Sequence, residues 1–141
     1  MQVENILQSK GRTVVTVAAR ATIAEAVDLL NRNKIGAVVV TDGGHVAGIF
    51  SERDVVRNLG RDWDALARRP VSEVMTKAVV SVTRRASLDD LMERMTEHRI
   101  RHIPVVEGGD LVGIISIGDV VKRKIEETEL EADALKQYIA S

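Results

Sequence analysis

The fold is decided by a stretch of sequence that occurs twice, as Gly48-Ile49-Phe50-Ser51-Glu52-Arg53-Asp54-Val55-Val56 and as Gly113-Ile114-Ile115-Ser116-Ile117-Gly118-Asp119-Val120-Val121. A shift of 65 positions relates the two copies, and it also places residues 12–60 over residues 77–125 without a gap. A repeat of this length without low complexity indicates one structural unit used twice. We expect the two copies to pack about a pseudo-twofold axis.

Each repeat has the pattern strand, helix, strand, strand, helix, which predicts an α/β (α+β) fold of two β-α-β-β-α repeats. In the first repeat Val14-Val15-Thr16-Val17 is a short strand, and the capping box Thr22-Ile23-Ala24-Glu25 begins a helix. Strands at 35–41 and 46–50 flank a hairpin turn at Asp42-Gly43-Gly44. Ser51 then begins the second helix. The second repeat has its capping box at Ser87-Leu88-Asp89-Asp90 and its turn at Glu107-Gly108-Gly109-Asp110.

The segments around the repeats complete the predicted domain organisation. Residues 1–60 form repeat 1 with a lead-in helix, 61–70 a connector, 71–125 repeat 2 with its own lead-in, and 126–141 an extension of the last helix. Along that long C-terminal helix an apolar stripe steps by four and three residues, like the a and d positions of a coiled coil. It either packs on its own domain or pairs with a partner helix. Its members are Val121, Ile125, Thr128, Ala132, Leu135 and Ile139.

Length and composition bound the class of protein. A chain of 141 residues has the size of one domain. Since a repeat of roughly 50–60 residues buries only about 60% of its surface, we expect the two halves to share a core. The chain has 20 basic and 21 acidic residues, so no overall charge favours nucleic acid or anionic lipid.

Features that the sequence lacks exclude further classes of protein. The sequence has no cysteine, which excludes disulfides and thiolate chemistry. It shows no secretory signal and no apolar run of the ~18–20 residues that cross a bilayer. We therefore expect a cytoplasmic protein that does not associate with membranes.

The duplicated motif resembles that of tandem cystathionine β-synthase (CBS) domains, the pair called a Bateman module. The resemblance rests on Gly-h-h-Ser-x-x-Asp (h, apolar) at 48–54 and 113–119, and on Arg101-His102-Ile103-Pro104-Val105-Val106 before the second hairpin. It implies a stand-alone regulatory module that binds an adenine nucleotide (AMP, ADP, ATP, sometimes NAD(H) or S-adenosylmethionine) between its repeats. It also implies a homodimer and an unidentified regulated protein.

The motif suits a nucleotide on chemical grounds. A strand that leads into a helix N-terminus presents unpaired N–H groups to a phosphate. An ionised carboxylate can accept both hydroxyls of a ribose, a role that falls to Asp54 and Asp119, with Ser51 and Ser116 nearby. The same Ser-x-x-Asp pattern is also an ordinary helix cap, and the two roles can coexist.

The resemblance implies two clefts, each taking its Ser and Asp from one repeat and its first two strands from the other. The two differ in charge, because cleft A has two arginines and a histidine where cleft B has glycines and an alanine. We expect cleft A to bind the phosphate-rich end of the ligand more tightly. Cleft A combines Ser51, Arg53 and Asp54 with Val80, Ile100, Arg101 and His102. Cleft B combines Ser116 and Asp119 with Val15, Ile35, Gly36 and Ala37.

Other classes of function fit less well. The three histidines are scattered, so neither a catalytic arrangement nor a metal cluster is visible, and we expect no enzyme and no catalytic cofactor. The Gly-x-Gly-x-x-Gly of a dinucleotide-binding Rossmann domain is missing. With one Trp, one Tyr and one Phe, the chain lacks the aromatic platforms of single-stranded nucleic-acid readers. The remaining alternative is a dimerisation or interaction scaffold whose clefts are degenerate.

Overall fold

The computed structural model describes residues 1–140 as two compact units. Unit 1 comprises residues 1–12, 81–107 and the chain from Val112 onward; unit 2 comprises residues 13–80 and 108–111. Ser141, the last residue of the predicted extension, lies outside the described residues. The chain crosses between units more than once, so neither unit coincides with one continuous repeat of the sequence.

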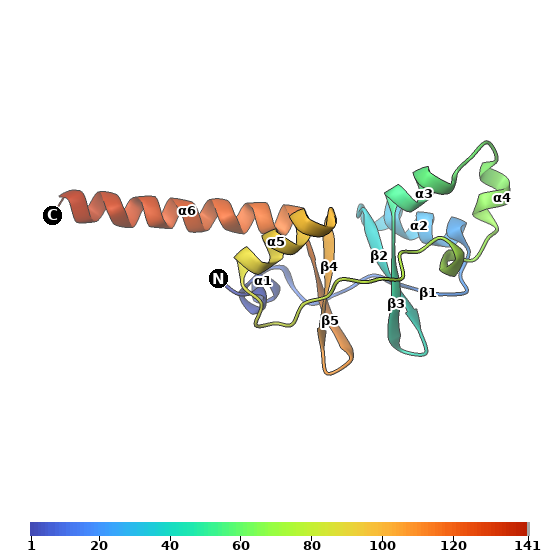
Figure 1. The fold of residues 1–141 in the computed structure, drawn as a ribbon, viewed down its shortest axis with the longest axis horizontal. Helices are drawn as coiled ribbons and strands as arrows, with labels where there is room; N and C mark the ends of the chain where they lie inside the picture. The colour runs from blue at the N-terminus through green and yellow to red at the C-terminus, as the bar shows by residue number, and fades with distance from the viewer. Residues whose placement is uncertain (141) are drawn as a thin grey trace. The chain divides into compact units, whose positions relative to one another are not determined.

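Unit 2 contains a three-stranded sheet of order β1-β2-β3 (Figure 1). β2 pairs in parallel with β1 and antiparallel with β3, in a register that places Ala37 opposite Ser51. This order agrees with the predicted pattern, except that the expected connector 61–70 contains the short helix α4. The elements are β1 (Thr16–Ala18), α2 (Ile23–Asn33), β2 (Ala37–Asp42), β3 (His45–Ser51), α3 (Glu52–Asn58), α4 (Trp63–Ala67) and η1 (Val71–Glu73).

Local sequence signals account for these elements. The hydroxyl of Thr22 accepts from the backbone N–H of Glu25 at 3.2 Å, and the Glu25 carboxylate accepts in return, so the capping box begins α2 as predicted. Gly43 and Gly44 have φ of 58° and 82°. Two consecutive residues of positive φ form the turn that joins antiparallel strands most tightly, which explains the Gly-Gly pair of the hairpin.

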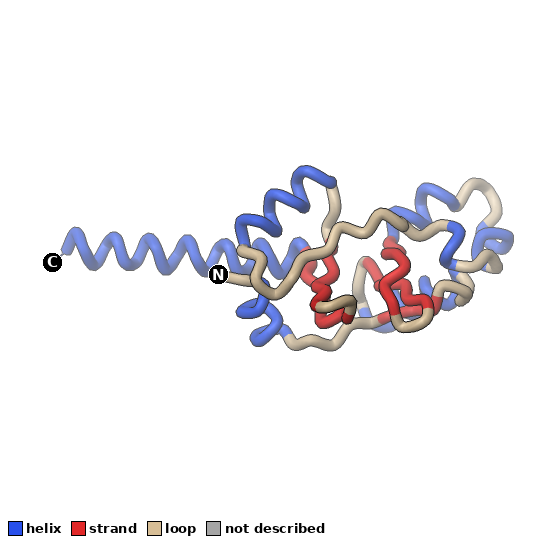
Figure 2. The backbone as a smooth tube through the Cα atoms, turned by 60° about the horizontal axis from the view of Figure 1, so that its bottom comes forward, coloured by secondary structure: helices blue, strands red, loops and turns tan. Residues whose placement is uncertain are grey.

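Unit 1 contains the second repeat and a long final helix. Its two-stranded sheet is β4-β5, and Figure 2 shows the helices and strands along the backbone. Ser87 caps α5 through the backbone N–H of Asp90 at 3.0 Å, as predicted. No helix in the described part of the chain is both long and apolar enough to span a membrane. The elements are α1 (Val3–Lys10), α5 (Leu88–His98), β4 (His102–Glu107), β5 (Asp110–Ser116) and α6 (Ile117–Ala140).

The first strand of repeat 2, expected at 79–82, is reduced to a single parallel bridge between Val82 and Val105. A proline explains the loss at one end of the strand. In repeat 1 the backbone N–H of Val39 donates to the carbonyl of Val15 at 3.4 Å. The repeat places Pro104 at the position of Val39, and proline has no N–H to donate. The ladder therefore stops one bond earlier in repeat 2.

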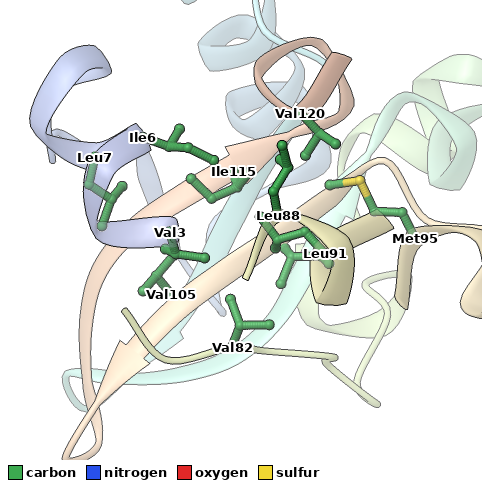
Figure 3. Packing of buried hydrophobic residues seen from close by; sticks show 11 residues of the cluster. Val3, Ile6, Leu7, Val82, Leu88, Leu91, Met95, Val105, Ile115 and Val120 are labelled. Carbon is green, nitrogen blue, oxygen red and sulfur yellow. The ribbon is translucent and has the colours of Figure 1, made fainter. Parts of the chain in front are cut away.

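Each unit has its own hydrophobic core, where the sequence predicts one shared core. The core of unit 1 includes Val3, Ile6 and Leu7 of α1, which lie against strands and helices of repeat 2 (Figure 3). The core of unit 2 includes Val71 and Val74, from the segment that precedes repeat 2 in the chain. Each lead-in therefore packs on the repeat other than the one it precedes.

The motif glycines are the contact points for these exchanged segments. A Cβ on Gly113 would lie 2.5 Å from Cδ2 of Leu7, in α1. A Cβ on Gly48 would lie 2.6 Å from Sδ of Met75 and 2.7 Å from the carbonyl oxygen of Thr76. Only glycine leaves room for so close an approach. The glycine of Gly-h-h-Ser-x-x-Asp is thus a packing residue in both repeats.

Candidate functional site

The two Ser-x-x-Asp motifs have the same local geometry. The Asp54 carboxylate accepts from the backbone N–H of Ser51 at 2.8 Å and from its hydroxyl at 3.4 Å. The Asp119 carboxylate accepts from Ser116 in the same way, at 2.9 Å and 3.0 Å. These four hydrogen bonds all reach Oδ2 of the aspartate. Each motif therefore caps its helix, and capping through one carboxylate oxygen is compatible with a ligand at the other.

Each motif lies beside the residue that comes just before β2 in repeat 1 or just before β4 in repeat 2. The backbone N–H of Glu52 donates to the carbonyl of Gly36 at 3.1 Å. In the second repeat the N–H of Ile117 donates to the carbonyl of Arg101 at 2.8 Å. These bonds satisfy the first free N–H of α3 and of α6. The sequence-predicted residues at 36 and 101 are thereby held next to the serine that precedes each helix.

The remaining predicted site residues are divided between the units. Unit 2 holds Val15, Ile35, Gly36, Ala37, Ser51, Arg53, Asp54 and Val80; unit 1 holds Ile100, Arg101, His102, Ser116 and Asp119. Arg53 and Arg101 are exposed, Ala37 and Asp54 are buried, and the others are partly buried. The two clefts that combine residues of both repeats stay predictions.

Asp54 is an unusual residue for the interior of a protein. It is 6% exposed and is the one buried polar or charged residue among those the structure describes. Burial raises the pKa of its carboxyl, and the hydrogen bonds from Ser51 and the charge of Arg57 offset this only in part. A buried carboxylate with a raised pKa at the end of a strand is a typical feature of functional sites.

Asp119 has a partner that its counterpart Asp54 lacks. Nζ of Lys10, at the end of α1, lies 2.7 Å from Oδ2 of Asp119 and donates to the carbonyl of Ile114 at 2.8 Å. Burial alone would raise the pKa of Asp119, but the hydrogen bonds from Lys10 and Ser116 and the lysine charge outweigh it, so the pKa is lowered. The sequence does not reveal this role of Lys10, because α1 precedes repeat 1 in the chain whereas Asp119 belongs to repeat 2.

Replacing Lys10 with methionine is expected to lower the free energy of unfolding by about 1–2 kcal/mol near pH 7. The pKa of Asp119 is lower in the folded than in the unfolded chain, so its contribution is complete above the ordinary aspartate value of 3.8 and is lost as the pH falls through the folded pKa. Urea unfolding of the variant and the unmodified protein, repeated from about pH 7 down to about pH 2.5, should show the difference shrinking with acid.

Asp119→Asn is the matched control for this ion pair. It removes the carboxylate charge but keeps the hydrogen bond from Lys10 to the Ile114 carbonyl. In a double-mutant cycle the two substitutions should be non-additive near pH 7, because each removes the same interaction. An additive pair, or a Lys10 effect that is equal at both ends of the pH range, would show that the ion pair contributes nothing.

Each motif presents carboxylate and hydroxyl oxygens that can accept hydrogen bonds. Each motif sets a carboxylate at the N-terminus of a helix, whose dipole favours an anion and whose first residues carry N–H groups. The part of the chain that the structure describes contains no group of three His, Cys, Asp or Glu residues able to hold a metal ion.

Comparison with known proteins identifies the family. The CBS domain model matches residues 6–61 and again residues 71–126. The CBS domain-containing protein YhcV of Bacillus subtilis is 37% identical over 110 residues, which are 76% of each chain. The crystal structure of the CBS-domain containing protein ATU1752 from Agrobacterium tumefaciens is 50% identical, with a TM-score of 0.84, over 88% of this chain and 99% of that one.

A more distant structure has the same fold and contains ligands. The CBS domain pair of protein MJ0100, in complex with 5′-methylthioadenosine and S-adenosyl-L-methionine, is 23% identical, with a TM-score of 0.78, over 90% of this chain and 98% of that one. The duplicated motif, the two repeat-sized matches and the shared fold agree. The chain belongs to the CBS domain family, as a tandem pair of CBS domains.

Proposed function

We propose that this CBS pair is a regulatory module that binds an adenine nucleotide (AMP, ADP, ATP or NAD(H)), senses energy or redox state and acts on a protein partner still to be identified. The observation that carries the proposal is the buried carboxylate of Asp54, whose pKa is raised beside Ser51 at the start of α3. An ionised carboxylate that is buried from water is costly in the free protein. A ribose that donates two hydrogen bonds to it would relieve that cost.

The comparisons support the chemical class of the ligand. CBS domain pairs are regulatory modules, and the ligands named for MJ0100, 5′-methylthioadenosine and S-adenosyl-L-methionine, share an adenosine group. The part common to both is a base and a ribose, and the ribose hydroxyls are the groups that we propose Ser51 and Asp54 bind. That the ligand is AMP, ADP, ATP or NAD(H) is part of what we propose. The cytoplasmic location and the absence of catalysis are part of it as well.

Thermal melting in the presence of candidate ligands tests this function directly. The panel contains AMP, ADP, ATP, NAD+, NADH, S-adenosylmethionine and 5′-methylthioadenosine. GTP, whose base is guanine, is the control. A ligand at about 100 times its Kd adds roughly 2.7 kcal/mol to stability, a shift of several degrees for a chain of this size. We expect a shift with at least one adenine compound and none with GTP.

Lys10 favours a second candidate function for the site in unit 1. Its ion pair already satisfies Asp119, so this copy of the motif is stable without a ligand. Lys10 also places a positive charge in a half-site that the sequence predicts to be neutral. If no adenine compound shifts the melting temperature, the alternative holds: a dimerisation or interaction scaffold in which the motifs serve only as caps.

A further inference from the structure

The C-terminal half of α6 lies outside the hydrophobic core of its unit. Every residue from 128 to 140 is exposed, and Figures 1 and 2 both show this half of the helix extending away from the rest of unit 1. An isolated helix of roughly 12–15 residues is only marginally stable in water. A helix this exposed is therefore better explained by a partner helix than by its own propensity.

The exposed face of α6 is apolar. The members of the stripe that are large and apolar range in exposure from 51% at Val121 to 75% at Ile139. Thr128 and Ala132, between them, are exposed as well. Because all members of the stripe are exposed, the stripe does not pack on its own domain within unit 1.

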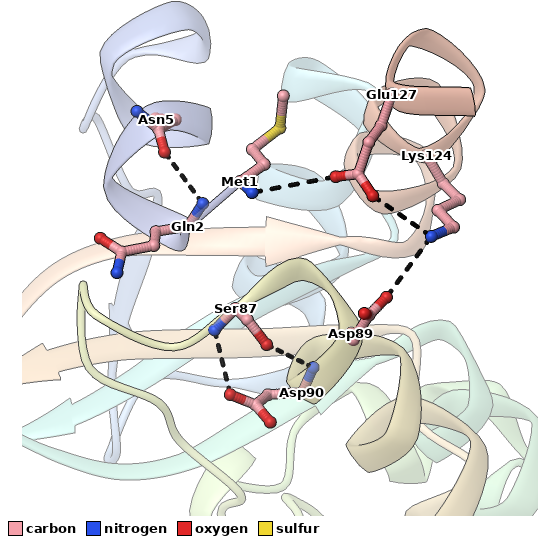
Figure 4. Close-up of polar contacts among 8 residues, drawn as sticks. All are labelled: Met1, Gln2, Asn5, Ser87, Asp89, Asp90, Lys124 and Glu127. Carbon is pink, nitrogen blue, oxygen red and sulfur yellow. Dashed lines mark hydrogen bonds and ion pairs between the residues drawn. The ribbon is translucent and has the colours of Figure 1, made fainter. Parts of the chain in front are cut away.

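Side chains beside the stripe and behind it hold the first half of α6 in its unit. Lys124 donates to Glu127 at 3.3 Å and to Asp89 of α5 at 3.5 Å, and the terminal amine of Met1 lies 3.8 Å from Glu127 (Figure 4). Arg123 donates to Glu126 at 3.0 Å. None of these contacts covers the stripe, and Val121 and Ile125 stay exposed.

We propose that a second copy of this chain covers the stripe, with the two α6 helices parallel and in register. The spacing places Val121, Thr128 and Leu135 at d positions and Ile125, Ala132 and Ile139 at a positions of a coiled coil. In a parallel pair each of these residues faces its own counterpart. The proposal names the surface of the homodimer that the sequence predicts, and it does not depend on which ligand the motifs bind.

The charges beside the stripe select the parallel arrangement. In a parallel pair, a g residue of one helix faces the e residue of the following heptad in its partner. Lys124 then faces Glu129, and Glu131 faces Lys136, and the symmetry of the dimer makes each pair twice. All four contacts join opposite charges, which is the pattern that sets orientation in coiled coils.

The antiparallel arrangement places like charges together. To match the whole stripe, Val121 must face Ile139 of the other helix, and Ile125 must face Leu135. Residues at e then face e, and residues at g face g. Glu129 meets the partner's Glu129, Glu131 meets the partner's Glu131, and Lys122 meets the partner's Lys136. The same apolar stripe is buried, but its flanks repel each other.

Lys136→Glu distinguishes the two arrangements by the sign of its effect. Lys136 and Glu131 are both exposed, and neither takes part in an ion pair among the described residues, so the substitution leaves unit 1 intact. In the parallel dimer it sets two glutamates together and weakens association by roughly threefold to tenfold. The double variant Glu131→Lys with Lys136→Glu restores the original affinity. Sedimentation velocity over a range of protein concentrations measures both.

The other outcomes overturn the proposal. Tighter association of the Lys136→Glu variant would mean an antiparallel pair, since that glutamate would then face Lys122. No change would mean that α6 is not the interface, and a full-length protein that stays monomeric at every concentration would leave the stripe uncovered. Circular dichroism of each variant confirms that the helix content is unchanged.

A cysteine cross-link provides a second, independent measurement. The natural chain has no cysteine, so any disulfide must join two copies at the introduced position. Leu135→Cys places the two sulfurs opposite each other in a parallel, in-register pair, whereas the neighbouring Ala134→Cys places them on the outside. We expect the first to form a covalent dimer at least roughly ten times faster on oxidation. Equal rates would contradict the parallel register.

Discussion

Replacing Gly48 with alanine is expected to lower the free energy of unfolding by about 3 kcal/mol. The new Cβ would lie 2.7 Å from the carbonyl oxygen of Thr76. That carbonyl cannot retreat, because it accepts from the N–H of Ile49 at 3.0 Å, and the N–H of Thr76 donates back to Ile49 at 2.8 Å. The methyl group must therefore strain the strand or break this pair of hydrogen bonds.

Chemical and thermal unfolding measure the loss, which for a chain of this size corresponds to a fall in Tm of roughly 6–12 °C. Gly113→Ala is the matched variant in the other repeat. Its Cβ would meet only the end of the Leu7 side chain, so we expect a smaller loss, about 1–2 kcal/mol. Gly118→Ala is the control, because its Cβ would lie 3.6 Å from the Ser116 hydroxyl and alanine favours a helix.

The ranking of the three variants tests the explanation. If Gly48→Ala were no more destabilising than Gly118→Ala, the motif glycine would not be a packing residue. The ligand site would then be the better reason for its place in the motif. A fall in stability at Gly48 and Gly113 together, without one at Gly118, supports the exchange of lead-in segments between the repeats.

The parts of the fold that could be predicted from sequence are those set by neighbouring residues. The capping boxes at Thr22 and Ser87 and the Gly-Gly hairpins lie where local chemistry places them, because each signal acts within four residues. The shortened first strand of repeat 2 was also open to prediction, since Pro104 is visible in the sequence and its lack of an N–H is general.

The parts that could not be predicted depend on contacts between distant segments. Val3 and Ile6 carry the apolar spacing of a helix that buries one face, but nothing in that spacing says which repeat the face contacts. The contact of Lys10 could not be predicted for the same reason, because Lys10 and Asp119 are 109 positions apart in the sequence. A lysine near a helix C-terminus is ordinarily explained by its favourable interaction with the helix dipole. The motif residues of the candidate site could therefore be named from the sequence, whereas the contact of Lys10 with Asp119 could not.

Replacing Asp54 with alanine is expected to weaken binding of an adenine nucleotide about 100-fold or more. Two ribose hydroxyls donating to an ionised carboxylate contribute roughly 1.5–3 kcal/mol each, and tenfold in affinity corresponds to about 1.4 kcal/mol. The stability of the free protein should change less than its affinity, because the ionised carboxylate is costly to bury. Isothermal titration calorimetry of the ligand found by thermal melting measures the loss.

The pH dependence of that affinity has a definite sign. Burial raises the pKa of Asp54 in the free protein, and hydrogen bonds donated by the ligand favour the ionised form and lower it again. Binding should therefore release a proton from Asp54 when the pH is near its raised pKa. Affinity should fall as the pH drops through that value, because the protonated carboxyl must first lose its proton.

Asp90→Ala is the control that separates a ligand role from a capping role. Asp90 accepts from the backbone N–H of Ser87 at 3.0 Å, the same contact that Asp54 and Asp119 make with their serines, but on a helix outside both motifs. If the two motif aspartates act only as caps, all three alanine variants bind the ligand with equal affinity, and the ligand contacts residues other than these carboxylates. If Asp54→Ala or Asp119→Ala loses affinity while Asp90→Ala keeps it, the carboxylate contacts the ligand. The same comparison shows which repeat supplies the tighter site, because Lys10 must release Asp119, in whole or in part, before a ribose can replace it.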